Sequence, residues 1–196
     1  MENTNDFTPE ESLHLIQTMI TKTKTSVAAD SFYLLFWGWL VFASCFIEYI
    51  LKVIVKYPDH YIIWWLMPIG GIVSAIYGAR QAKKQRVKTF VEEALDYLWI
   101  SLAFSFVTLV LINIFSSGWQ TAFTHYILLY AIGTFVTGKL IRFRPLVIGG
   151  LLNFIFAVIS VRFSYDNQLL LGGVAILTSY IIPGYLLRNK YRQKEN

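Results

Sequence analysis

The polar side chains inside the long apolar runs of this sequence are few, and they are the first candidates for chemistry. Glu48 is the only acidic residue within such a run. A carboxylate at membrane depth is a functional candidate, because burying its charge is costly. Lys52 follows four positions later, the spacing at which Glu and Lys pair on a helix. Two interpretations follow, a structural pair of Glu48 with Lys52 or a site that handles an ion or substrate, and we prefer the pair.

Two amides, Asn153 and Asn113, lie within other apolar runs. An amide buried in lipid usually bonds across to another helix, which contributes about 1 kcal/mol. We therefore expect both residues to hold helices together, and contact with a substrate is the alternative.

Two histidines, His60 and His125, each lie at the start of an apolar run. At one depth in a membrane, they could bind a metal or haem. Protein metal sites normally need further ligands, and no third ligand is fixed by spacing here. We prefer to interpret both residues as histidines at helix ends near the membrane boundary, and we expect no cofactor.

The composition indicates which solvent surrounds these residues. Hydrophobic residues make up 56% of the 196 positions and charged residues only 15%, against about 25% charged residues in ordinary soluble domains. Six continuous apolar runs are each long enough to cross a bilayer core of about 30 Å as a helix. They cover residues 32–55, 61–79, 97–115, 121–141, 146–161 and 169–187. The sequence predicts an all-α polytopic membrane helix bundle with about six transmembrane helices.

The basic residues predict the orientation of these helices, because cytoplasmic connections are enriched in Lys and Arg. If successive spans cross the membrane in opposite directions, the connections on the outer side contain only Lys52, Lys56 and Arg162. The remaining Lys and Arg fall in the segment before the first span, the second and fourth connections, and the tail. Both termini are therefore expected on the cytoplasmic side of a bacterial inner membrane. Since the net charge of +5 is explained by this pattern, nucleic acid is not an expected partner.

Three regions are predicted along the chain. Residues 1–31 form a cytoplasmic segment, residues 32–187 the transmembrane domain, and residues 188–196 a basic cytoplasmic tail. The first segment holds an amphipathic helix that begins at Thr8, where Glu11 completes a capping box. We expect this helix to lie at the membrane interface or against the bundle, and a docking surface for a soluble partner is the alternative.

Small residues at Gly70, Ser74 and Gly78 recur every four positions in the second run. Such a ridge allows another helix to approach closely, and the sequence leaves open whether that helix belongs to the same chain. His60-Tyr61 and His125-Tyr126 also begin alternate runs, which suggests a duplicated two-helix hairpin.

Catalytic motifs such as HExxH, a P-loop or a GxSxG elbow do not occur in the sequence. The segments ESLHLIQTMITKTK, YLLFWGWLVF and RPLVIGGLLNFIFA resemble a family of uncharacterised bacterial multi-pass inner-membrane proteins. The resemblance implies six spans and supplies no activity. We expect a non-enzymatic scaffold, sensor or membrane partner that contacts the lipid bilayer and either a second copy or a cytoplasmic protein. The alternative is a small transporter or channel component with a polar site near Glu48 and Asn153.

Overall fold

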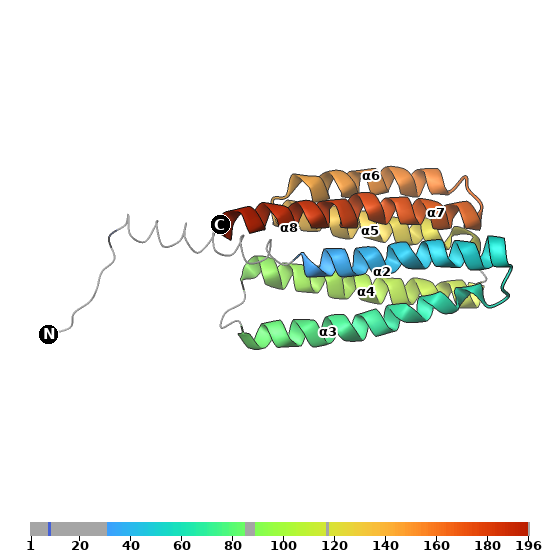
Figure 1. Ribbon diagram of the computed structural model, residues 1–196, viewed down its shortest axis with the longest axis horizontal. Coiled ribbons are helices and arrows are strands. Elements are labelled where there is room, and N and C mark those ends of the chain that lie inside the picture. The colour runs from blue at the N-terminus through green and yellow to red at the C-terminus, as the bar shows by residue number, and fades with distance from the viewer. Residues whose placement is uncertain (1–7, 9–30, 85–88, 117, 196) are drawn as a thin grey trace.

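The computed structural model describes residues 8, 31–84, 89–116 and 118–195, and within these ranges the chain forms helices and no strands. Six helical rods in the described residues run up and down side by side (Figure 1). In chain order they are α2 (Phe32–Tyr49) continued by η1 (Ile50–Val55); η2 (His60–Trp65) continued by α3 (Leu66–Lys84); α4 (Phe90–Ser116); η3 (Gly118–Thr121) leading into α5 (Ala122–Leu140); α6 (Arg144–Ser160); and α7 (Tyr165–Ile176), η4 (Leu177–Ile181) and α8 (Ile182–Glu195) in one line.

The predicted all-α architecture is confirmed for these residues. Four of the described rods are long and apolar enough to cross a membrane, namely Phe32–Ile54, His60–Gln81, Phe90–Ser116 and Tyr165–Lys190. The α6 helix is apolar but has only 17 residues, and α5 has 19 residues but is less apolar. The amphipathic helix predicted to begin at Thr8 lies outside the described residues except for Thr8 itself.

The closest helix contact in the bundle joins α5 to α6 at glycines. A Cβ added at Gly150 would lie 2.6 Å from the backbone nitrogen of Phe135, and one at Gly138 would lie 2.7 Å from that of Val147. Each helix therefore offers a glycine where the backbone of the other passes. This approach suits a helix pair in lipid, where packing rather than the hydrophobic effect brings helices together.

The sixth rod changes its winding where it meets α6. Pro183 has no N–H to donate within the helix, and just before it the Ile182 N–H bonds the Leu177 carbonyl, the wide pattern of a π-helix. A Cβ added at Gly149 would lie 2.7 Å from the Cα of Ser179 in this widened turn. The α6 backbone is thus held between α5 and η4.

The ridge of small residues on α3 packs against α2 of the same chain. A Cβ added at Gly70 would lie 2.6 Å from a methyl carbon of Leu40. Ser74 Oγ accepts a hydrogen bond from Trp37 Nε1 at 3.0 Å, and Gly78 faces the Tyr33 hydroxyl.

The remaining faces of α3, and most of α4, are exposed and apolar. Large exposed side chains include Ile69, Ile72 and Ile76 on α3 and Phe104, Val107 and Leu111 on α4. Figure 1 shows α3 at the edge of the bundle. The two predicted hairpins pack differently, because the first helix is central in the α2–α3 hairpin and the second is central in the α4–α5 hairpin.

Replacing glycine with alanine at two positions distinguishes the effect of backbone packing on stability from the effect of helix propensity. Gly150→Ala is expected to lower the free energy of unfolding by about 1–3 kcal/mol, because the new methyl group overlaps the Phe135 backbone. Gly71→Ala is the matched control, since nothing lies within 4 Å of its added Cβ, and alanine there gains up to about 1 kcal/mol of helix propensity. Thermal unfolding of the detergent-solubilised protein measures both, and equal shifts for the two variants would contradict the assigned contact.

Candidate functional site

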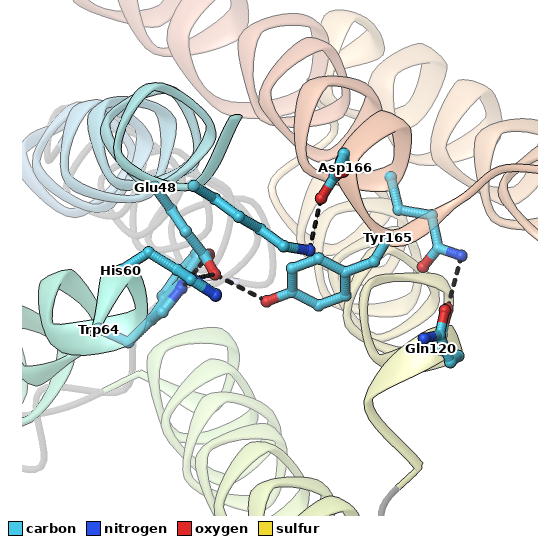
Figure 2. A network of polar contacts seen from close by, with 8 residues as sticks. Glu48, His60, Trp64, Gln120, Tyr165 and Asp166 are labelled. Carbon is cyan, nitrogen blue, oxygen red and sulfur yellow. Dashed lines mark hydrogen bonds and ion pairs between the residues drawn. The ribbon is translucent and has the colours of Figure 1, made fainter. Parts of the chain in front are cut away.

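Glu48 lies near the end of α2 and its side chain is fully buried, with 0% exposure. Its carboxylate lies within hydrogen-bonding distance of three polar groups. Oε1 is 2.9 Å from His60 Nδ1 and accepts a hydrogen bond from the Tyr165 hydroxyl at 2.9 Å. Oε2 accepts a hydrogen bond from Trp64 Nε1 at 2.5 Å. Figure 2 shows His60, Trp64 and Tyr165 converging on Glu48 from two directions.

The chain reversal after α2 positions the first two of these groups. Lys56 adopts a left-handed conformation with φ 58°, which ends the helical rod. The chain then enters the tight helix η2, which packs along the end of α2. His60 and Trp64 both belong to η2, so the turn returns them to the helix that carries Glu48. The third group, Tyr165, comes from the first residue of α7.

Lys52 pairs with a different acid from the one the sequence predicts. Its Nζ lies 2.5 Å from Asp166 Oδ1 and 4.2 Å from the centre of the Tyr165 ring. The predicted Glu48–Lys52 pair is therefore wrong. The rod adopts π-helical winding from Ile50, which changes the angular offset between positions 48 and 52, and Asp166 lies within reach on α7.

Gln168 extends this network to the other two connections at the same end. Its Nε2 donates to the Gln120 carbonyl at 2.9 Å and to the Phe163 carbonyl at 3.0 Å, and the side chain is buried. One amide thereby links the α4–α5 connection to the α6–α7 connection (Figure 2). Sequence reasoning missed Gln168 because it lies just before an apolar run.

Aromatic rings cover the inner side of the polar network. Phe123 is buried and contacts the rings of Trp64, Tyr126 and Tyr165. Because these rings exclude water, the hydrogen bonds around Glu48 lie in a medium of low dielectric, where electrostatic attraction is stronger.

The arrangement has the chemistry of a stabilised carboxylate. Trp Nε1–H can only donate, and the Tyr165 hydroxyl donates to the same acid, so the Glu48 oxygens act as acceptors for both. An ion or substrate that reaches the carboxylate must displace His60, Trp64 or Tyr165. All three residues are partly exposed, and 22% of the His60 side chain is accessible.

The two amides predicted from the sequence have partners on neighbouring helices. Asn153 is fully buried, and its Nδ2 donates to Ser179 Oγ at 3.0 Å, joining α6 to η4. Asn113 Nδ2 donates to the Tyr126 hydroxyl at 3.3 Å, joining α4 to α5. Neither contacts the Glu48 network, so the structure brings no shared polar site together from Glu48, Asn153 and Asn113.

The two histidines have separate partners. His60 Nδ1 faces Glu48, whereas His125 Nδ1 lies 2.9 Å from the carbonyl of Thr121 in its own helix. His125 also lines a shallow groove between α4 and α5, beside Phe104 and Thr108. No group of three or more His, Cys, Asp or Glu side chains able to hold a metal occurs in the described parts of the chain.

No protein-family model, curated protein or solved structure matches this chain significantly. Its family resemblance therefore stays a prediction from the sequence, and function must be argued from the contacts themselves.

Removing one donor tests the Glu48 network. Tyr165→Phe is expected to lower the free energy of unfolding by about 1–3 kcal/mol, because it leaves a buried carboxylate oxygen with one partner fewer. Tyr61→Phe is the matched control, since the Tyr61 hydroxyl bonds Asp59 at an exposed position, where changes usually stay within about 0.5 kcal/mol. Thermal unfolding in detergent measures both variants. A Tyr165→Phe protein as stable as the Tyr61→Phe protein would show that the network does not hold these helices together.

Proposed function

We propose that this chain is a six-span protein of the bacterial inner membrane, with both termini in the cytoplasm, that acts as a non-enzymatic scaffold, sensor or membrane partner of another protein. The observation that carries the proposal is the closure of the Glu48 carboxylate on His60, Trp64 and Tyr165. The most costly polar group of the apolar runs is used to join helices of its own chain. A transport site would instead leave such a group open to an ion or substrate.

The other buried amides support the same proposal. Asn153 bonds Ser179 and Asn113 bonds Tyr126, each on a neighbouring element. These contacts favour a bundle held together by its polar groups over a small transporter or channel component, which is the alternative function. A water-filled path from His60 to Glu48 would favour the alternative.

The distribution of charge along the bundle supports the proposed orientation. The end of α3, the α5–α6 turn and the end of α8 lie at one end of the bundle (Figure 1). Exposed basic residues at that end include Arg80, Lys83, Lys139, Arg142, Arg144, Arg188 and Lys190. The opposite end holds Lys52, Lys56 and Arg162, and there Lys52 is neutralised by Asp166. The basic end is the one expected in the cytoplasm.

Cysteine labelling tests this topology. The wild-type chain supplies its own background, because its single cysteine, Cys45, is buried with 1% exposure. We expect Tyr57→Cys to react with a membrane-impermeant maleimide in intact spheroplasts, and Lys83→Cys to react only after the membrane is permeabilised. The reverse pattern would overturn the orientation, and reaction of both before permeabilisation would overturn the span count.

Photocrosslinking in native membranes tests the partner role. A photoreactive residue at Lys83 or Arg188, both exposed at the basic end, is expected to form a defined adduct with a protein. The control position is Ile155, which is exposed on the apolar face of α6 and is expected to face lipid. If the basic end forms no more protein adduct than Ile155, the chain has no partner there and the proposal fails.

A further inference from the structure

The turn between α5 and α6 is anchored by buried residues and carries two exposed arginines. Ile141 and Phe143 are each only 7% exposed, and the Phe143 N–H bonds the Gly138 carbonyl at 2.9 Å. Arg142 and Arg144 alternate with these buried residues and are exposed. Phe143 has an extended backbone, with φ −114° and ψ 101°, and it separates the two arginines by a single buried residue. The anchored turn therefore carries two exposed arginines that are one residue apart.

Each of these arginines occupies a position that is locally unfavourable. Arg142 has φ 54°, a left-handed conformation that glycine adopts without strain and that costs other residues free energy. Arg144 is the first residue of α6, where the positive end of the helix dipole repels a cation. Neither forms an ion pair with any residue in the described ranges, where the pair of Lys52 with Asp166 lies at the opposite end. An external anion would compensate both positions.

Further cations lie beside the turn. Lys190 of α8 places its Nζ 5.5 Å from the centre of the Phe143 ring. Lys139, in the last turn of α5, places its Nζ 5.6 Å from the centre of the Phe135 ring. Lys190 thus adds a positive group from α8 beside the turn, and Lys139 adds one from the last turn of α5 at the same end of the bundle. A phosphate group, with its charge and its acceptor oxygens, matches two guanidinium groups well.

The surface next to Arg144 indicates what carries the phosphate. Ile148 lies one helical turn further along α6 on the same face, and Leu151 and Ile155 continue that face. All three are exposed, Ile148 at 57%. A cationic group at the head of an exposed apolar stripe fits a molecule with a charged head and a hydrocarbon chain.

We propose that the α5–α6 turn is a binding site for an anionic phospholipid, in which Arg142 and Arg144 bind the headgroup phosphate and the apolar stripe of α6 contacts an acyl chain. The inference rests on the membrane location in the proposed function, but not on the existence of a protein partner. Its failure would leave the crosslinking and topology outcomes unchanged.

The first experiment measures lipid binding by purified protein in neutral detergent. We expect phosphatidylglycerol to raise the thermal unfolding midpoint of the wild type in a saturable way, and phosphatidylcholine to do so weakly. The double variant Arg142→Gln/Arg144→Gln is expected to lose about tenfold to thirtyfold in apparent affinity for phosphatidylglycerol, because each cation contributes at an anionic surface. The double variant Arg80→Gln/Lys83→Gln is the control, since it removes the same charge from exposed positions at the same end of the bundle.

Three outcomes of this experiment would overturn the proposal. An equal loss in the Arg80→Gln/Lys83→Gln protein would show a general charge effect. Equal stabilisation by both lipids would show that the phosphate charge is not recognised. Saturation by inorganic phosphate at the concentrations where phosphatidylglycerol acts would show a site for a free anion.

A single substitution keeps the proposal testable if the double variant does not fold. Glycine adopts the left-handed conformation of position 142 without strain, so Arg142→Gly is expected to be at least as stable as the wild type in neutral detergent. The same variant is expected to bind phosphatidylglycerol several-fold more weakly. An Arg142→Gly protein that keeps wild-type lipid affinity would remove Arg142 from the site.

Discussion

The close contact of α5 with α6 is the constraint around which the rest of the bundle is arranged. In lipid, apolar surface gains little by leaving the solvent, so helices associate where their backbones can approach and where polar groups meet. Gly138 and Gly150 provide that approach between α5 and α6, and Gly149 extends it to η4. Asn153 lies on the same helix and adds a hydrogen bond to Ser179. These elements form a tight centre, against which α2 and α7 also pack.

The polar network at Glu48 acts through hydrogen bonds rather than close backbone contact, and it lies at one end of the bundle. It joins α2, η2 and α7 through one carboxylate, and the Lys52–Asp166 pair and Gln168 reinforce the same end. A buried charge of this kind contributes specificity as much as stability, since other pairings of these helices would leave it without donors. The bundle therefore combines a close-packed middle with a hydrogen-bonded end.

Much of the fold could be predicted from the sequence, because apolar runs of sufficient length specify helices with little dependence on context. The contacts of Glu48 could not be predicted in the same way. The spacing to Lys52 suggested a local pair, but π-helical winding from Ile50 and the distant Asp166 decide the pairing. Gln168 and Tyr165 lie more than a hundred positions from Glu48 in the chain, and only the packed bundle brings Tyr165 to the carboxylate. The ridge at Gly70 was recognisable as a contact, but its partner, α2, became known only from the structure.

The α5–α6 pair also has a consequence for how the chain enters the membrane during synthesis. The α5 helix is less apolar than the four helices that could cross a membrane, and α6 has only 17 residues, so these two are the least suited to partition into a bilayer alone. Only the short segment Ile141–Phe143 joins them, and each helix has a glycine where the backbone of the other passes. In the proposed six-span arrangement they are suited to leave the translocation machinery together as a preassembled hairpin.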